Sequence, residues 1–334
     1  MWLIYTCDYV ITNNQFNNFK KDFDKLVELY KEKYSVDKKR DWQEYEKEYY
    51  ERLMIAAREI RPIVAEANYL LLHNLKCIGR KSAINYTDKT VILLLKDIFE
   101  VSNRKMACFL AFFSAFTGIE VGYKTVERLY SDPIIMMTVY NMFKVMIRRK
   151  DIRHANISGD GTGYSLTVMK HYSTNVRKQE DGKKTFAWAF AFLDLDTNMY
   201  VGFGSGMRSE KEAFNNAKKM MDSFEITIDA ARLDMYYTYQ TITEEFDSGT
   251  KLYLLPKSNT TINGTPKWHE IWKSMMRDTM SYFQEYYKRE SSESGFAADK
   301  KSNGWKVWQK RDDRISTSIM CKGAWHNLLW IGKG

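Results

Sequence analysis

The chain contains the stretch Tyr286-Tyr287-Lys288-Arg289-Glu290-Ser291-Ser292-Glu293, continued by Ser294-Gly295-Phe296-Ala297-Ala298-Asp299-Lys300. Four of its side chains combine a phenol, two cations and a carboxylate: Tyr286, Arg289, Lys300 and Glu293. On a helix that turns about 100° per residue, the positions −7, −4 and +7 from Glu293 fall within roughly 60° of one another. One helical face would then carry all four groups. Because a carboxylate can bind a divalent metal ion and cations can hold phosphate, the pattern favours phosphodiester chemistry.

The stretch ends a long amphipathic helix that the sequence predicts over residues 268–293. Its apolar residues recur at helical spacing: Trp268, Ile271, Trp272, Met275, Phe283 and Tyr286. Upstream, β-rich segments predict strands at residues 156–160, 185–195, 199–206, 225–234 and 251–255. Helices are predicted between them at residues 209–224, where Ser209 and Glu212 form a capping box, and at residues 237–246.

The predicted order is therefore three strands, helix, strand, helix, strand and long helix. A three-strand meander followed by αβα units implies a mixed sheet flanked by helices, so the predicted fold class is mixed α/β. The ribonuclease H fold has this order of elements. We therefore predict a ribonuclease H-like catalytic domain over residues 151–334.

The first part of the chain reads as mostly helical. Helices are predicted at residues 16–34 and 42–60, with Pro62 interrupting the second or beginning the next one. We assign residues 1–100 to a helical N-terminal region for dimerisation or DNA binding.

A helix-turn-helix pattern occupies residues 101–150. An apolar helix at 105–118 is followed by a Gly-containing turn and a second helix at 123–130, stopped by Asp132-Pro133. Lys124, Thr125 and Arg128 would be exposed on the second helix and contact DNA. An ordinary αα-hairpin is the alternative. A basic exit of four residues is either a solvated linker or a grip on phosphates: Lys144, Arg148, Arg149 and Lys150.

Two aspartates at predicted strand ends are candidate partners for Glu293. Asp160 lies in Ser158-Gly159-Asp160-Gly161-Thr162 at the end of the first strand, where small neighbours let a metal ion approach. Asp234 follows the fourth strand, and Asp229, five residues earlier, is its competitor. A plain Asp-Gly turn is the alternative for Asp160, and a solvated or capping role is the alternative for the other two.

Three carboxylates suit a two-metal site. Two Mg²⁺ ions about 3.5–4 Å apart activate an attacking oxygen and stabilise the leaving one. Two ions that share one carboxylate need one further acid each, which makes three in all. Such a site needs no protein nucleophile, because water or a 3′-hydroxyl attacks the phosphorus.

Composition agrees with a polyanionic partner. The 51 Lys and Arg residues exceed the 42 Asp and Glu residues and give a net charge of +9, which a generic basic soluble protein would also show. The four cysteines have no metal-ligand spacing, so we expect reduced, buried thiols rather than a zinc site or disulfides. We found neither a secretory signal nor a membrane-spanning run, and we expect a soluble, cytoplasmic protein.

These residues resemble the DDE transposases of prokaryotic insertion sequences, and most closely those with a Y-R-E-K signature, here Tyr286, Arg289, Glu293 and Lys300. The family's first acid has a D-G-T-like context, matched by Asp160-Gly161-Thr162. Its second has a D-x-x-Y context, matched by Asp234-Met235-Tyr236-Tyr237, which favours Asp234 over Asp229. The chain departs from the family in having Tyr236 where a small residue is usual, and Gly295 is a candidate for an early helix end.

The resemblance implies an enzyme that binds terminal inverted repeats of double-stranded DNA, hydrolyses a strand at each transposon end and joins the 3′-hydroxyls to target DNA. Asp160, Asp234 and Glu293 would hold two Mg²⁺ ions, with Mn²⁺ as a substitute. Arg289 and Lys300 would contact phosphate, and Tyr286 would stack on or bond to the DNA. Holding two ends together implies a homodimer, associated with the nucleoid.

Two other functions remain open from the residues. A metal-dependent nuclease would share the fold and the three acids without strand transfer. A DNA-binding regulator would use the helix-turn-helix, with structural carboxylates. Two further motifs have simpler explanations: residues 202–206 (Gly-Phe-Gly-Ser-Gly) as a strand with a turn, and His326-Asn327 as part of a packed terminal helix.

Overall fold

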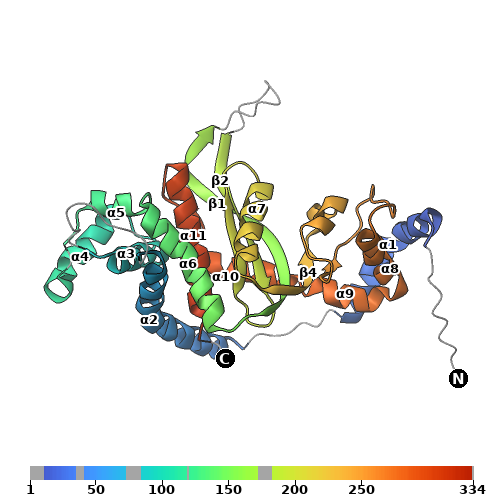
Figure 1. Cartoon of the computed structure of the whole chain (residues 1–334), viewed down its shortest axis with the longest axis horizontal. Helices are drawn as coiled ribbons and strands as arrows, with labels where there is room; N and C mark the ends of the chain where they lie inside the picture. The colour runs from blue at the N-terminus through green and yellow to red at the C-terminus, as the bar shows by residue number, and fades with distance from the viewer. Residues whose placement is uncertain (1–10, 35–40, 73–83, 119, 172–182, 333–334) are drawn as a thin grey trace. The chain divides into compact units, whose positions relative to one another are not determined.

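The computed structural model describes residues 11–34, 41–72, 84–118, 120–171 and 183–332 (Figure 1). This part of the chain divides into two compact units. Helix α1 (Asn13–Tyr34) forms the first unit together with residues 156–158 and 228–290. The second unit contains residues 41–155, 159–227 and 291 onward. The two units are interleaved along the sequence, and each is described on its own.

The first unit has an aromatic core between α1 and two later helices, α8 (Pro266–Arg277) and α9 (Thr279–Tyr287). The ring centroids of Phe16 and Trp272 lie 5.5 Å apart, and those of Phe23 and Phe283 lie 5.6 Å apart. Phe16 and Phe23, which belong to the region assigned to dimerisation or DNA binding, are thus buried inside this unit. The unit also holds β5 (Lys251–Tyr253), which pairs with β4 (Thr227–Leu233) in parallel, and two 3-10 helices, η1 (Met235–Tyr237) and η2 (Gln240–Glu244).

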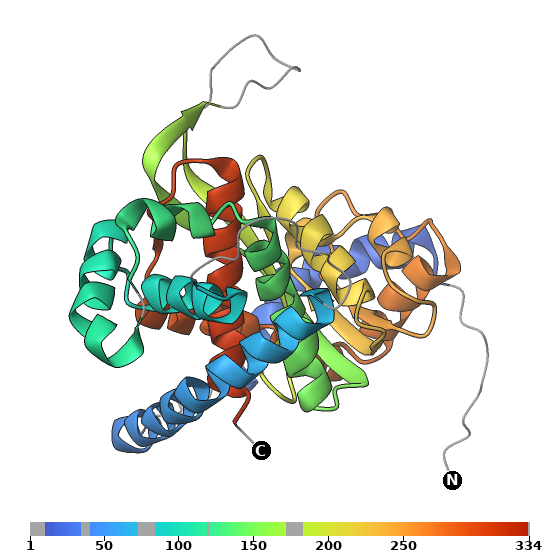
Figure 2. The ribbon, with the colours of Figure 1, turned by 60° about the vertical axis from the view of Figure 1, so that its left-hand side comes forward.

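The second unit contains a helical part. Its members are α2 (Trp42–Leu72), α3 (Tyr86–Ile98), α4 (Asn103–Thr117), α5 (Tyr123–Leu129) and α6 (Pro133–Arg149). Helix α5 packs against both α3 and α4, and the three helices form the teal and green cluster in Figure 2. Pro62 lies inside α2, so the predicted interruption of this helix is wrong. Ile63 and Val64, which directly follow the proline, are fully buried, and their packing holds the helix together despite the missing N–H.

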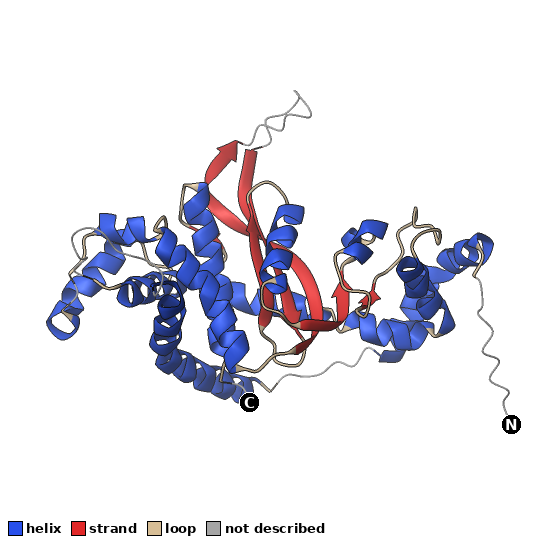
Figure 3. Cartoon of the chain, in the orientation of Figure 1, coloured by secondary structure: helices blue, strands red, loops and turns tan. Residues whose placement is uncertain are grey.

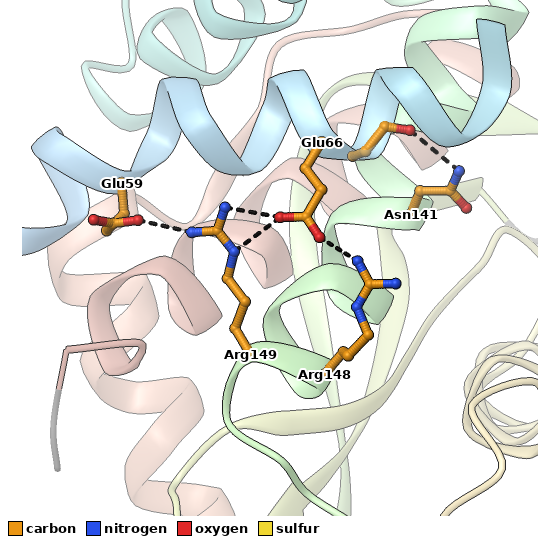
Figure 4. Close-up of polar contacts among 6 residues, drawn as sticks. Glu59, Glu66, Asn141, Arg148 and Arg149 are labelled. Atoms are coloured by element: carbon orange, nitrogen blue, oxygen red, sulfur yellow. Dashed lines mark hydrogen bonds and ion pairs between the residues drawn. The ribbon is translucent and has the colours of Figure 1, made fainter. Parts of the chain in front are cut away.

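Polar contacts join α2 to α6 (Figure 4). The Arg149 guanidinium donates to Glu66 at 2.8 Å and to Glu59 at 2.8 Å, and Arg148 also donates to Glu66. Partial burial opposes ionisation of Glu66, but hydrogen bonds from both arginines outweigh it and lower the pKa of this carboxyl. Arg148 and Arg149, two of the four basic residues predicted as a linker or as phosphate contacts, therefore pair with glutamates inside this unit.

The described strands form one six-stranded sheet of order β3-β2-β1-β4-β5, with β6 (Lys306–Val307) paired to β1. Strands β1 (His154–His171), β2 (Lys183–Asp194) and β3 (Tyr200–Gly206) follow one another along the chain, and β2 and β3 are antiparallel. The Thr227 N–H donates to the Arg153 carbonyl at 2.9 Å, so β1 and β4 begin at the same edge of the sheet. This sheet and its helices confirm the predicted mixed α/β class.

Strand β3 contacts α7, α11 and α6, and Figure 3 shows helices packed against the strands of the sheet. Side chains alternate across a strand, and here the glycines face α7 (Glu210–Asp222) while Phe203 faces Gly323 of α11 (Asp312–Trp330). Phe203 also stacks on Phe143 of α6, with ring centroids 5.9 Å apart. The predicted N-cap of α7 is confirmed, because the Ser209 hydroxyl accepts the Glu212 N–H at 3.1 Å.

The single long helix predicted at residues 268–293 is wrong. The chain forms α8, α9 and α10 (Glu290–Asn303) instead. Asp278 separates α8 from α9. Its carboxylate accepts the Ser281 N–H at 3.1 Å and so caps the start of α9. At the second junction Ser158 donates to the Arg289 carbonyl at 3.2 Å. Gly295 does not end a helix, since α10 continues to Asn303.

Other elements differ in extent from the predictions. The first strand continues to His171, so Asp160 lies within β1 rather than at its end. The α-helix predicted at residues 237–246 is replaced by the short 3-10 helix η2 at Gln240–Glu244. Cys321 is buried but Cys108 is exposed, which corrects the expectation of buried thiols, and Cys7 and Cys77 lie outside the described residues. Among the described helices we find no stretch with the length and apolar character that a bilayer crossing requires.

Candidate active site

Asp234 lies at the point where β4 ends. Its carboxylate accepts the Tyr236 N–H at 2.8 Å and caps the 3-10 helix η1, which fixes the side chain just beyond the strand. Its other oxygen lies 3.4 Å from Nη1 of Arg289. Asp229 is exposed inside β4 instead. Asp234 thus lies at the end of β4 with its carboxylate beside the Arg289 guanidinium.

Arg289 stands between α9 and α10 and is largely buried. Its guanidinium lies 5.7 Å from the centroid of the Tyr286 ring. Tyr286 is only 2% exposed, and burial raises the pKa of its phenol, opposed by Arg289 and reinforced by Asp234. A ring so deeply buried has no open face for stacking on a base. Within the first unit, then, three predicted residues come together: Asp234, Tyr286 and Arg289.

The second unit brings together Lys300 and the strand segment around Asp160. Lys300 Nζ donates to Thr162 Oγ1 at 2.6 Å, and it lies 5.4 Å from the centroid of the Tyr164 ring. Burial lowers the pKa of the Lys300 ammonium, while the nearby Asp160 carboxylate opposes this shift. Within this unit, Lys300 therefore lies beside the strand segment that carries Asp160.

Glu293 is exposed on α10. Lys300 is seven residues further along the same helix, so the two side chains lie within about 20° of each other around its axis. Tyr286 belongs to α9 and Arg289 to the junction. The prediction that one helical face carries all four residues is therefore wrong, and only Glu293 and Lys300 share a face.

The three candidate acids, Asp160, Asp234 and Glu293, are not gathered into a metal-binding cluster among the described residues. Across the residues that the structure describes, there is no group of three or more His, Cys, Asp or Glu side chains arranged to hold a metal ion. Asp160 and Glu293 belong to the second unit and Asp234 to the first. Their carboxylate oxygens are nevertheless the hard donors that Mg²⁺ and Mn²⁺ prefer.

One acid beside this site was missed in the sequence. The carboxylate of Glu210, the first residue of α7, lies against Gly161, in space that a side chain at position 161 would fill. The only sequence signal was its place in the first turn of a helix, where acids are common for another reason, namely the helix dipole. Its nearness to the residue after Asp160 depends on how α7 folds back onto the sheet.

A buried network behind α10 was also not predicted. Asp299, 4% exposed, accepts the Tyr200 hydroxyl at 2.7 Å and lies 2.8 Å from Nδ1 of His326. The other ring nitrogen of His326 lies 2.7 Å from the Asn198 carbonyl. His326 and Asn327 were expected in a packed terminal helix, and α11 places both in the core. The network ties the helix that carries Glu293 and Lys300 to β3 and α11.

The helix-turn-helix candidates lie on α5. Lys124, Thr125 and Arg128 are all exposed, while Val126 and Leu129 are buried beneath them. Gly118 ends α4 with a left-handed backbone (φ 65°). The two predicted helices therefore exist, with a polar face turned to solvent.

Comparison with known proteins finds a curated relative. No family model matches the chain. A probable transposase for insertion sequence element ISA1214, from Archaeoglobus fulgidus, is 36% identical over 256 residues. The match covers 77% of this chain and 78% of that protein. With this identity over most of both sequences, the chain belongs to the transposases of insertion sequence elements.

Proposed function

We propose that this transposase cuts DNA at the inverted-repeat ends of its element and joins the freed 3′-hydroxyls to target DNA, with Asp160, Asp234 and Glu293 as its three catalytic acids. One observation carries the proposal. The segment from Arg289 to Lys300 is tied to the second acid at one end, through Arg289, and to the strand of the first acid at the other, through Lys300. Glu293 lies between these two anchors.

The strand arrangement supports the same assignment. Strands β1 and β4 are neighbours and begin at one edge, where Thr227 donates to the Arg153 carbonyl. Asp160 comes seven residues after Arg153, and Asp234 comes seven residues after Thr227. Equal spacing from neighbouring strand starts is what a shared site for the two acids would require. The order of elements in turn supports the ribonuclease H-like fold.

The proposed roles follow from the chemistry of each group. Carboxylate oxygens of the three acids would hold the metal ions, which when bound polarise the scissile phosphate and activate the attacking oxygen. Arg289 and Lys300 have ordered cationic heads beside Asp234 and Asp160, and they would neutralise phosphate oxygens near the cut. Exposed Lys124, Thr125 and Arg128 would contact duplex DNA through the helix-turn-helix. A homodimer would hold the two ends.

The test uses the full chain and a plasmid that carries the element with its flanking DNA. We expect strand cleavage and joined products with Mg²⁺ or Mn²⁺ and neither with EDTA. Asp160→Asn, Asp234→Asn and Glu293→Gln should each reduce cleavage by about 10³-fold or more, as expected when one member of a cooperating catalytic set is removed. DNA binding, followed by electrophoretic mobility shift, should persist.

Asp229→Asn is the matched control. Asp229 is an exposed acid on β4, the strand that Asp234 directly follows. It should keep full cleavage. Unchanged cleavage in Asp160→Asn would overturn the assignment of the acids. Metal-dependent cleavage without joined products would indicate a nuclease, and binding without any cleavage would indicate a DNA-binding regulator.

A further inference from the structure

Two exposed tryptophans stand between α10 and α11 in the second unit. Trp305 is 54% exposed and Trp308 is 52% exposed. Single apolar side chains on a surface need no explanation, but two indoles within four residues expose a large aromatic area. The metal chemistry proposed above does not use either of them.

The segment that carries them is held firmly. The Ser165 N–H donates to the Trp305 carbonyl at 3.0 Å, and Lys306 and Val307 pair with β1. Before it, Gly304 has a left-handed backbone (φ 70°), and its carbonyl accepts from buried Lys322 at 3.1 Å. Both indoles are thus presented from an ordered backbone, which lowers the entropy lost when a ligand binds.

The buried and exposed sides of the segment differ. Val307 and Gln309 are buried, whereas Lys306, Trp308 and Lys310 are exposed. Lys306 Nζ lies 5.0 Å from the centroid of the Trp305 ring. In the order Trp305, Lys306, Trp308 and Lys310, aromatic rings and cations alternate along the sequence, and all four side chains are exposed. Lysines on an edge strand can serve to prevent pairing with a strand of another chain. That role does not account for the two exposed indoles.

The position of the segment relates it to the first acid. Lys306 is the register partner of Ser165, which lies five residues after Asp160 on β1. At about 3.3 Å per residue, this places the segment some 17 Å along the strand from Asp160. A DNA strand cut near Asp160 would reach that distance within about five nucleotides.

We propose that residues 305–310 form a stacking site for unpaired DNA bases close to the cleaved end. Aromatic faces take up bases of any sequence, and interleaved lysines neutralise the phosphates between them. The positive charge favours a polyanion over an apolar protein partner. The proposal rests on the proposed function for its location, because that function puts DNA beside Asp160.

The experiment measures binding by fluorescence anisotropy with the full chain. The probes are a labelled single-stranded DNA of about 12 nucleotides and a blunt duplex of the same sequence. The double variant W305A/W308A should bind the single strand at least about tenfold more weakly, since each stacked base contributes roughly 1–3 kcal/mol. Duplex binding should change by less than about threefold, because paired bases keep their own stacking.

Two further variants keep the result decisive. W305F/W308F retains the π faces and should restore single-strand affinity to within about threefold of the wild type. Tyr69→Ala removes an aromatic ring that is 66% exposed on α2 and should change nothing. Circular dichroism melting checks that each variant is folded.

The outcomes separate this inference from the proposed function. Equal single-strand affinity in the wild type and W305A/W308A overturns the stacking site, and so does an equal loss for both probes. If the wild type shows no metal-dependent cleavage while the tryptophan dependence holds, the proposed function fails and the stacking site stands. If cleavage occurs without that dependence, only the stacking site fails.

Discussion

At the scale of single residues, Asp299 is a buried carboxylate on the helix that carries Glu293 and Lys300. It is almost fully buried and faces both the Tyr200 hydroxyl and the His326 ring. Because the Asn198 carbonyl only accepts hydrogen bonds, Nε2 of His326 carries a proton. Asp299→Asn breaks a buried pair, and we expect a loss of about 3 kcal/mol in the free energy of unfolding, measured by urea denaturation.

A control with the same chemical change is available on α7. Asp222 pairs with Lys218 at 2.6 Å but is more than half exposed, so Asp222→Asn should cost less than about 1 kcal/mol. Similar losses in the two variants would contradict the structural role assigned to Asp299. Combining Asp299→Asn with His326→Gln should cost less than the sum of the single changes, since the two residues share one interaction.

At the scale of elements, the contact between β3 and α7 depends on close backbone approach. A Cβ at Gly204 would lie 2.8 Å from the Asn216 carbonyl carbon and would meet the backbone of Ala213 and Ala217 more closely still. Backbone atoms cannot rotate away as a flexible side chain does. Gly204→Ala should therefore destabilise the protein by about 2–3 kcal/mol, measured as a lowered thermal midpoint. Gly249→Ala, with open space around its Cβ, should be nearly neutral.

The same scale shows what the sequence could predict. Periodicity located the three-strand meander, α7 and β4, and motif context selected Asp160, Asp234 and Glu293 as candidates. Periodicity could not divide residues 268–293, because the apolar spacing continues across breaks that are made by a capping Asp278 and by a distant Ser158. Glu210 and Asp299 were missed for a related reason: their partners come from other elements, and no local pattern records them.

At the scale of the whole molecule, the net charge of +9 gives the chain a field that attracts DNA regardless of sequence. Direct contacts between cations and phosphates affect the salt dependence of DNA affinity differently from this general field. A cation that touches a phosphate releases counterions, so the slope of log affinity against log salt falls by about 0.9 for each contact that is lost. A cation elsewhere changes the net charge without changing that count.

We therefore expect K124Q/R128Q on α5 to reduce the slope for duplex DNA by nearly two, measured by anisotropy titrations between about 50 and 200 mM salt. The matched variant K21Q/K25Q removes the same charge from exposed positions on α1 and should leave the slope unchanged. Equal reductions in both variants would mean that the overall field governs binding and that α5 holds no specific phosphate contacts. A reduction confined to K124Q/R128Q would place the duplex on the helix-turn-helix, because only contacts made in the complex contribute to counterion release.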